Sequence, residues 1–278
     1  MKNFYIIVSE NDPKSAKQIE KTKKSIIKSL KRYDFISCDT HEGFLERGFK
    51  IPKDVECVIT IGGDGTMLRA ARAAFGGSVL FIGINRGHMG YLTEISELTD
   101  YDSFTDRLVN DNFKIQERMM LSARAERNGK LIYKDFALND VLMCKNDTVR
   151  MMEYEVYVND TFLNSYRADG FLVSSPTGST GYSMSAGGPI AEPSAKLLIL
   201  TPICPHSINT RSMVLSADDR IKIIPKNETQ LVSCDGADAT PLENGDILTV
   251  TRSRTTMKFI KFKETSFLDT LRERMRTV

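Results

Sequence analysis

The sequence predicts a two-part fold: an α/β domain with a parallel sheet, followed by a mainly β domain and a final helix. Three observations lead to this prediction. In the first third of the chain, short apolar runs alternate with helix-like stretches, which is the pattern of β-α-β units. After about residue 113, β-like runs separated by turn signals replace this alternation. The segment 266–275 is again amphipathic with a helical period.

The apolar runs of the first part are short and continuous, as expected for strands buried on both faces of a parallel sheet. They span residues 3–8, 55–61 and 79–84. Pro13 opens a lysine-rich helical stretch to about Lys31, and its expected inward positions are Ala16, Ile19, Ile26, Ile27 and Leu30. We expect the lysines to form a solvated outer face, with an anionic docking face as the alternative. A second helix is expected over 67–75, stopped by Gly76 and Gly77.

Turn signals organise the second part. Asn128-Gly129 lies between the runs 121–126 and 131–133, and both residues tolerate a positive φ, which favours a hairpin. Asn159-Asp160 lies in the same way between 154–158 and 162–166. Further strands are expected at 171–174, 197–200, 220–224, 231–234, 247–251 and 258–262, and Ser266 is the expected N-cap of the last helix. We therefore expect domains over 1–105 and 106–262, with the helix 263–278 a candidate to pack back on the first domain.

Composition limits the function classes. The chain has 278 residues, 41% hydrophobic and 27% charged, which excludes a largely disordered, collagen-like or coiled-coil protein. The net charge of +2 does not indicate nucleic-acid or membrane binding. No apolar run approaches the ~20 residues that span a bilayer, and the N-terminal apolar stretch is too short for a signal peptide. The five scattered cysteines lack a C-x-x-C pair, which argues against disulfides and zinc and predicts a cytoplasmic protein.

The first glycine-rich turn follows a predicted buried strand and precedes a predicted helix. Glycines let the backbone approach a ligand closely, and helix N-terminal N–H groups attract phosphate. We expect a phosphate group to bind at Gly62, Gly63, Gly65 and Thr66. The turn is neither a Walker A loop nor G-x-G-x-x-G, which disfavours hydride chemistry. Asp64 is the candidate to accept a proton from an attacking hydroxyl or to help hold Mg²⁺; the alternative is that it only caps the helix.

The second glycine-rich segment, 174–189, contains hydroxyls, glycines and one tyrosine without any charge. Such a segment offers hydrogen-bond donors, bare backbone and an aromatic plane to a nucleotide. The alternative is a flexible Ser/Gly loop. Four residues that a flexible linker does not need argue against it: Pro176, Tyr182, Met184 and Pro189. No histidine lies nearby in the sequence, so a Ser-His-Asp hydrolase is not indicated.

Several motifs occur in order over most of the chain. They are GGDGTMLR at 62–69, GINRGHMGYL at 83–92, ALND at 137–140, RADG at 167–170, SSPTGSTGYSMSAGGP at 174–189, TPICPHS at 201–207 and SCDG at 233–236. Together they resemble the NAD kinases. GGDG alone also occurs in diacylglycerol, sphingoid-lipid and 6-phosphofructo-kinases, whereas the PTGST-type segment after an Asn-Asp pair and a DG pair singles out the NAD kinases.

The resemblance implies a Rossmann-like N-terminal α/β domain, a mainly β C-terminal domain and a cleft between them. It implies transfer of the γ-phosphoryl group of ATP, or of polyphosphate in some members, to the adenosine ribose 2′-hydroxyl of NAD. Asp64 would be the general base, and Mg²⁺ or another divalent cation would come with ATP. The family also implies a homodimer or homotetramer in which a neighbouring subunit completes the NAD site.

The resemblance further implies a set of NAD-binding residues. They are Asp64, Gly65, Arg69, Asn139, Asp140, Arg150, Arg167, Asp169, Thr180, Gly181, Tyr182, Ser183, Met184 and Ser185. Asp140 stands where Glu is commoner in the family, Gly181 replaces a frequent Ala, and Ala237 replaces a frequent Gln. In related enzymes a basic residue at the position of Arg167 goes with a preference for NAD over NADH, so we expect that preference here.

Two alternatives remain open from the sequence. A related lipid or sugar kinase would share the GGDG turn, and a lipid kinase would show an exposed apolar entry surface. A non-catalytic dinucleotide-binding regulator would share the fold. The presence of Asp64 argues against the regulator, because a binding protein has little reason to keep an acid near phosphates.

Overall fold

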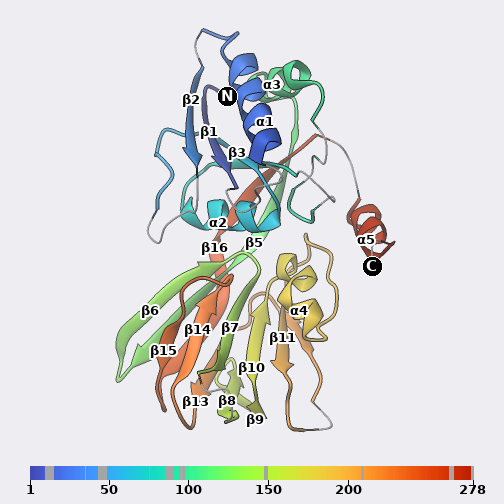
Figure 1. Ribbon diagram of the computed structural model, residues 1–278. Helices are drawn as coiled ribbons and strands as arrows, with labels where there is room; N and C mark the ends of the chain where they lie inside the picture. Colours follow the sequence, from blue (N-terminus) through green and yellow to red (C-terminus); the bar gives the residue numbers. More distant parts are fainter. Residues whose placement is uncertain are drawn as a thin grey trace. The chain divides into compact units, whose positions relative to one another are not determined.

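The computed structural model describes residues 1–9, 16–34, 36–42, 49–74, 76–85, 90–93, 95, 98–146, 150–207, 210–262 and 266–276 (Figure 1). The chain divides into two compact units. The first unit comprises Met1–Glu117 and Met257–Val278, and the second comprises Arg118–Thr256. The long strands β5 (Lys114–Arg127) and β16 (Ile247–Lys261) run through the boundary, so each contributes residues to both units.

The first unit is built on a parallel sheet, as predicted. Its strands are β1 (Asn3–Val8), β2 (Ser37–Glu42), β3 (Cys57–Ile61) and β4 (Leu80–Ile84), in the order β2-β1-β3-β4. The end of β16 pairs with β4 in parallel. Strand β2 was not predicted because its sequence, SCDTHE, is polar, and it lies at the edge of the sheet.

Helix α1 (Ala16–Leu30) packs its apolar stripe into the first unit. Ile19, Ile26 and Leu30 are buried, as predicted. Ala16 is exposed, contrary to our expectation, because the buried stripe starts one turn later, at Ile19, and ends at Leu30. Ser29 is buried by α3 (Tyr101–Val109), where its Oγ lies 2.7 Å from Thr105 Oγ1.

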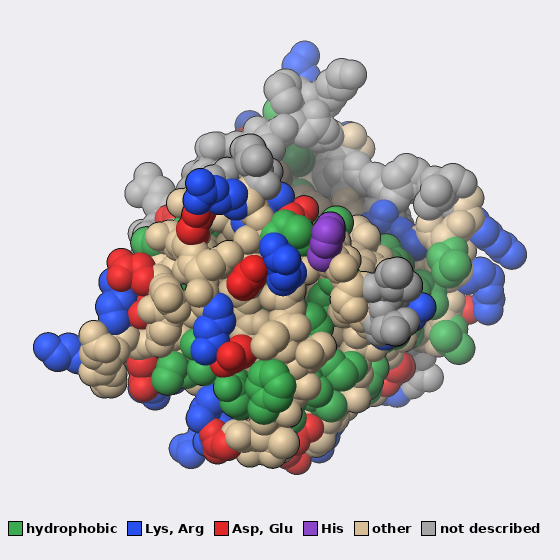
Figure 2. Space-filling view, turned by 90° about the horizontal axis from the view of Figure 1, so that it is seen from below, with side chains coloured by type: hydrophobic (Ala, Val, Ile, Leu, Met, Phe, Trp, Pro, Cys, Tyr) green, Lys and Arg blue, Asp and Glu red, His purple; other side chains and the backbone are tan. Residues whose placement is uncertain are grey.

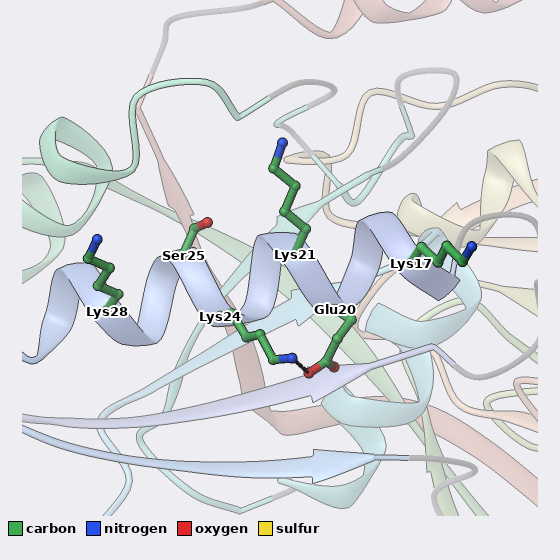
Figure 3. Close-up of a pocket in the computed structure, with 6 residues that line it drawn as sticks. All are labelled: Lys17, Glu20, Lys21, Lys24, Ser25 and Lys28. Atoms are coloured by element: carbon green, nitrogen blue, oxygen red, sulfur yellow. Dashed lines mark ion pairs between the residues drawn. The ribbon is translucent and has the colours of Figure 1, made fainter.

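The opposite face of α1 is rich in lysine. A surface pocket on this helix is lined by Lys17, Glu20, Lys21, Lys24, Ser25 and Lys28 (Figure 3). The four lysines of this set are exposed, and Lys24 Nζ lies 3.2 Å from Glu20 Oε1. Long lysine side chains with their ammonium groups in water are typical of a solvated helix face.

Helix α2 (Asp64–Ala73) begins earlier than predicted. Gly63 is its N-cap, so Asp64, Gly65 and Thr66 form its first turn rather than a loop before residue 67. An acidic residue in the first turn is favoured by the helix dipole. Because the helix starts early, Asp64 is a helical residue, and the backbone that carries its side chain is fixed by the helix.

The last helix, α5 (Phe267–Arg276), begins as predicted. Ser266 Oγ accepts a hydrogen bond from the Asp269 backbone N–H at 3.1 Å, so Ser266 is the N-cap. The Phe267 ring lies 6.4 Å from the Tyr91 ring, and the Arg274 guanidinium lies 5.5 Å from the centre of the same ring. These contacts attach the helix to the first unit, in agreement with the expectation that it packs back on the first domain. Among the described residues, no helix is long and apolar enough to cross a membrane.

The second unit is mainly β, as predicted, and its core lies between two sheets. One sheet is antiparallel and six-stranded, with the order β12-β11-β10-β7-β14-β15. Its strands are β7 (Asp140–Lys145), β10 (Gly170–Ser174), β11 (Leu197–Ile203), β12 (Met213–Ser216), β14 (Gln230–Cys234) and β15 (Thr240–Leu242). The other side of the core is formed by β8 (Met152–Val158), β9 (Thr161–Ala168), β13 (Ile221–Pro225), the first half of β16, β5 and β6 (Lys130–Ala137). These strands belong to the same ten-stranded sheet as β1–β4, and β5 pairs with both β16 and β6. Phe171 from one sheet and Tyr154 from the other lie in the same core, 5.4 Å apart.

Both predicted hairpins are present. Asn128 and Gly129 have φ of 49° and 75° between β5 and β6, and Asn159 and Asp160 have φ of 49° and 68° between β8 and β9. The predicted runs 247–251 and 258–262 lie along the single strand β16, which ends at Lys261, one residue before the end of the second run. On the face of the molecule drawn in Figure 2, positive and negative side chains are interspersed, as on an ordinary solvated surface.

Candidate active site

The Asp64 carboxylate is held by four hydrogen-bond donors in the first unit. Oδ2 accepts from the Tyr91 N–H at 2.8 Å. Oδ1 accepts from the Leu92 N–H at 3.2 Å, and from the N–H and hydroxyl of Thr93 at 3.1 and 2.9 Å. Each carboxylate oxygen has about two lone-pair positions. Oδ2 therefore keeps an acceptor position that no described residue occupies, whereas Oδ1 is saturated.

Two sequence motifs meet at this carboxylate. Asp64 belongs to the GGDG turn. Its donors Tyr91 and Leu92 end the GINRGHMGYL motif, of which residues 86–89 lie outside the described residues, and Thr93 directly follows that motif. Gly90 lies so close that a Cβ added there would be 2.0 Å from Asp64 Oδ1 and 2.2 Å from Thr93 Oγ1. Only glycine fits at position 90, because the Cβ of any other residue would collide with the Asp64 carboxylate. Tyr91 and Leu92 were predicted only as members of a motif, without a role, and Thr93 was not predicted.

The predicted phosphate-binding residues surround the start of α2. Gly63 and Gly65 are exposed, and no atom lies within 4 Å of a Cβ added at Gly63. A Cβ at Gly65 would lie 3.7 Å from Arg69 Nη1, so the Arg69 guanidinium lies beside this glycine. Gly62 and Thr66 are buried, and they contact each other: a Cβ at Gly62 would be 2.7 Å from Thr66 Oγ1. The turn thus exposes bare backbone next to Asp64.

A second constellation is formed in the second unit by residues 138–140, here called the 138–140 turn. The Asp235 carboxylate accepts hydrogen bonds from all three of its backbone N–H groups: Leu138 at 2.7 Å, Asn139 at 2.8 Å and Asp140 at 3.1 Å. The three carbonyls are also used. Asp140 O accepts from the Asp235 N–H at 3.0 Å, Asn139 O from the Ser175 N–H at 2.8 Å, and Leu138 O from the Ser175 hydroxyl.

The PTGST segment packs directly on this turn. It forms a 3₁₀ helix, η1 (Thr177–Thr180), followed by α4 (Tyr182–Ser185), and Figure 1 shows α4 beside β10 and β11. A Cβ added at Gly178 would be 2.1 Å from the Asn139 carbonyl oxygen. A Cβ at Gly181 would lie 3.6 Å from Asn139 Nδ2. Gly178 is therefore needed for the close approach of the segment to Asn139, whereas the distance at Gly181 is an ordinary van der Waals contact.

Asp140 and Tyr182 share one electrostatic neighbourhood. Asp140 is 7% exposed, and burial together with the nearby Asp235 carboxylate raises the pKa of Asp140 to about 7. The Tyr182 side chain is 46% exposed. Partial burial, the thiols of Cys144 and Cys204, and then the carboxylates of Asp140 and Asp169 raise the pKa of Tyr182.

Asp169 has a cationic partner that the sequence analysis missed. Lys145 Nζ lies 2.7 Å from Asp169 Oδ1, and the Lys145 N–H donates to the Asp169 carbonyl at 3.1 Å. Lys145 ends β7, and Asp169 connects β9 to β10. No periodic pattern links these residues in the sequence, since the pair depends on the antiparallel register of β7 with β10.

The remaining predicted residues differ in their surroundings. Met184 and Ser185 are exposed, Thr180 donates its hydroxyl to the Thr177 carbonyl at 3.3 Å, and Ser183 is buried. The buried hydroxyls of Ser174, Ser183 and Thr201 have no hydrogen-bond partner among the described residues.

Two predicted arginines pair with glutamates of the second unit. Arg150 pairs with Glu228, and Arg167 Nε lies 3.0 Å from Glu153 Oε1. Both guanidinium groups are exposed and neutralised by a carboxylate of the same unit. In the described part of the chain, no three His, Cys, Asp or Glu side chains are grouped to hold a metal ion.

Comparison with known proteins agrees with this architecture. The ATP-NAD kinase N-terminal domain model matches residues 3–113, and the ATP-NAD kinase C-terminal domain model matches residues 138–262. An NAD kinase of Lachnospira eligens is 38% identical over 240 residues, 81% of this chain and 82% of the relative. An NAD kinase of Moorella thermoacetica is 42% identical over 224 residues, 80% of this chain and 71% of the relative.

Solved structures share the fold at lower identity. A yeast NADH kinase in complex with NADH has a TM-score of 0.86 at 20% identity, covering 99% of this chain and 88% of that one. An NAD kinase from Archaeoglobus fulgidus in complex with ATP has a TM-score of 0.75 at 24% identity, covering 97% and 99%. The matched family models and the relatives agree, and the chain belongs to the NAD kinase family of phosphotransferases.

Proposed function

We propose that this enzyme transfers a phosphoryl group from ATP or polyphosphate to the 2′-hydroxyl of the adenosine ribose of NAD, giving NADP. The observation that supports this most is the Asp64 carboxylate. Four donors hold it, yet Oδ2 keeps one acceptor position that no described residue fills. The exposed Gly63 and Gly65 flank Asp64 in the chain. A fixed base next to bare backbone suits a hydroxyl that attacks a phosphate.

The proposed step is a single displacement at the γ-phosphorus. The ribose 2′-oxygen forms the new O–P bond, the bond from phosphorus to the β–γ bridging oxygen breaks, and ADP leaves with that electron pair. Asp64 Oδ2 takes the hydroxyl proton as the phosphoryl group arrives. Because phosphoryl transfer depends mainly on positioning and charge stabilisation, the first turn of α2 with Gly62, Gly63, Gly65 and Thr66 is proposed to hold the donor phosphates.

The cation is proposed to arrive with the nucleotide. Mg²⁺ or another divalent ion bound to ATP belongs to the substrate, and it neutralises phosphate charge. Arg69, whose guanidinium lies beside Gly65, is proposed to add positive charge at the same turn.

NAD, the phosphoryl acceptor, is proposed to bind through the domain over residues 106–262. The domain over residues 1–105 is proposed to bind the phosphoryl donor. Asn139 and Asp140 on the 138–140 turn would contact the adenosine half, and Tyr182 would stack on a ring. Asp169, Thr180, Gly181, Ser183, Met184 and Ser185 complete the proposed set, with Arg150 and Arg167 as outer contacts. The complexes of the solved relatives with NADH and with ATP support binding of both kinds of ligand.

Three finer points extend the proposal. Arg167 is a basic residue at a position that distinguishes acceptors in related enzymes, so we expect NAD to be preferred over NADH. The enzyme is proposed to be a homodimer or homotetramer in which a neighbouring subunit completes the NAD site. All five cysteines are unpaired, which supports action in a reducing cytoplasm.

A product assay tests the proposal. The full chain is incubated with NAD, Mg²⁺ and either ATP or polyphosphate, and NADP is measured with an NADP-specific dehydrogenase. NADP with either donor supports the proposed reaction and identifies the donor. Folded protein that binds NAD but makes no NADP with both donors would contradict the proposed catalysis and favour a regulator.

A further inference from the structure

The 138–140 turn has an unusual feature: two residues from other motifs satisfy its entire backbone. The Asp235 carboxylate accepts hydrogen bonds from the three N–H groups, and the Asp235 N–H donates to the Asp140 carbonyl. Ser175 donates to the other two carbonyls: its hydroxyl donates to Leu138 O, and its N–H donates to Asn139 O. All six backbone polar groups of the turn are therefore fixed from outside, by residues that lie 35 or more positions away in the sequence.

Asp235 is itself held in a turn that directs its carboxylate toward β7. Its φ is 51° and that of Gly236 is 69°, and the Ala237 N–H donates to the Cys234 carbonyl at 3.0 Å. The Ser233 hydroxyl donates to the Ala237 carbonyl at 2.6 Å. Aspartate tolerates the left-handed conformation better than most side chains. The SCDG motif is thus built to present one carboxylate to three consecutive N–H groups.

Ser175 links this clamp to the PTGST segment. Its side chain is fully buried, and its hydroxyl oxygen also accepts from the Gly178 N–H at 3.2 Å. A movement of η1 would therefore move Ser175, and with it the carbonyls of the 138–140 turn. The side chains that leave this turn, Asn139 and Asp140, have their direction set by these contacts.

We propose that Asp235, assisted by Ser175, is a positioning residue that sets the affinity for NAD by fixing the 138–140 turn from behind. This inference rests on the proposed function, in which Asn139 and Asp140 contact the dinucleotide. Asp235 acts through these two residues and touches no reacting atom. Removing its charge is expected to affect NAD binding more than ATP binding or the chemical step.

The charge of Asp235 gives this role a second readout besides affinity. Three neighbours face Asp140: Asp235 from the turn after β14, Tyr182 from α4, and the uncharged Ser174 across the β7–β10 pair. Because the Asp235 carboxylate contributes to the raised pKa of Asp140, its removal should lower that pKa. Any titration of Asp140 seen in NAD binding should then move to lower pH. Because burial is the larger cause of the raised pKa, this shift is read together with the split between NAD binding and kcat, which a merely structural defect would not produce.

The experiment compares Asp235→Asn with a matched control, Asp219→Asn. Asp219 Oδ2 accepts the Ser216 N–H at 3.0 Å in a turn of the same unit, and it is not part of the proposed site. For Asp235→Asn we expect the Kd and KM for NAD to rise about tenfold or more, the range for losing hydrogen bonds to a charged group. The KM for ATP and kcat should change less than about threefold, and the pH midpoint of NAD binding should fall. The control should match the wild type.

The outcomes separate this inference from the proposed function. If the wild type makes NADP but Asp235→Asn binds NAD with unchanged affinity and midpoint, the inference is overturned and the function stands. Equal losses for NAD, ATP and kcat also overturn it, because they indicate a general structural role. If the wild type makes no NADP, the proposed function fails, and calorimetric binding of NAD to both variants still tests the clamp. Should Asp235→Asn not fold, Ser175→Ala must raise the Kd for NAD; an unchanged value overturns the inference.

Discussion

Two regions of this molecule use the same device for different ends. In the first unit, Asp64 accepts hydrogen bonds from three consecutive backbone N–H groups, those of Tyr91, Leu92 and Thr93. In the second unit, Asp235 accepts from three consecutive N–H groups of the 138–140 turn. Each arrangement pairs a carboxylate with a short loop far away in the sequence, and each fixes both partners.

The difference lies in which partner faces the substrate in the proposed reaction. Asp64 is the working group, and the loop with Thr93 is its holder. Asp235 is the holder, and the loop carries the working side chains of Asn139 and Asp140. The comparison teaches that several backbone hydrogen bonds to a carboxylate do not by themselves mark a base; the residues presented beside it decide its role.

The largest expected effect is at Asp64. Asp64→Asn keeps the shape of the side chain but cannot take the hydroxyl proton, so kcat should fall by roughly 10²–10⁴. Thr93→Val removes only one of the four donors and should lower kcat far less. Steady-state assays with NAD and Mg-ATP, with thermal melts as a folding control, measure both. Near-wild-type turnover of folded Asp64→Asn would remove Asp64 from the role of base and break the comparison at its first member.

Glycine substitutions separate the two regions next. Gly90→Ala would place a Cβ 2.0 Å from Asp64 Oδ1, and Gly178→Ala would place one 2.1 Å from Asn139 O. We expect Gly90→Ala to lower kcat by about 10²-fold, since displacement of a reacting group by about 1 Å has effects of that size. Gly178→Ala should instead raise the KM for NAD. Gly63→Ala, where no atom lies within 4 Å, is the control for stability. Identical kinetic defects in the first two variants would contradict the division of roles.

Asp140 gives the comparison a pH dependence. Its pKa rises from 3.8 to about 7 on folding, so between these values the folded protein keeps a proton that the unfolded chain has released. Stability is therefore lost as pH rises through this window, at up to about 1.4 kcal/mol per pH unit. Asp140→Asn removes the titration, and its stability relative to wild type should increase by roughly 2–3 kcal/mol from pH 5 to 7.5.

Denaturant unfolding at several pH values checks this expectation. Asp219→Asn, a substitution at a partly exposed carboxylate of the same unit, should show a constant difference from wild type. A constant difference for Asp140→Asn as well would mean that Asp140 ionises normally in the folded protein. In the variant Asp235→Asn, a negative charge beside Asp140 is removed, so the pKa of Asp140 in the folded protein should be lower. The pH range over which stability is lost should therefore end at a lower pH.

Local signals in the sequence were enough to predict most of the fold. The buried runs that became β1, β3 and β4, and the Asn128-Gly129 hairpin, are specified by residues adjacent in the chain. Strand β2 was missed because its sequence is polar, and it is stabilised by pairing with β1. Helix α3 was overlooked although its sequence carries a local signal: Phe104, Thr105 and Leu108 follow a helical period, and Asp100 is its N-cap.

The candidate site divides in the same way. Asp64, Asn139 and Asp140 were found because they lie in recognisable motifs. Their holders were not found: Thr93 is 29 positions from Asp64, and Asp235 is 96 positions from Asn139. Such hydrogen bonds depend on how distant strands and turns are packed, and an isolated carboxylate in a sequence does not show which N–H groups it will meet.

The smallest expected effect is at Tyr182, whose ring is half exposed on α4. Tyr182→Ala should raise the KM for NAD by about tenfold, within the range for loss of one aromatic stacking partner, and should change the KM for ATP much less. Tyr182→Phe keeps the ring and should remain close to wild type, which separates stacking from any role of the hydroxyl. Equal weakening of NAD and ATP binding would place Tyr182 outside the adenosine pocket of NAD. It would also show that the second unit takes part in ATP binding as well as NAD binding. That result would contradict the division of roles drawn from Asp64 and Asp235, in which the second unit holds only the acceptor.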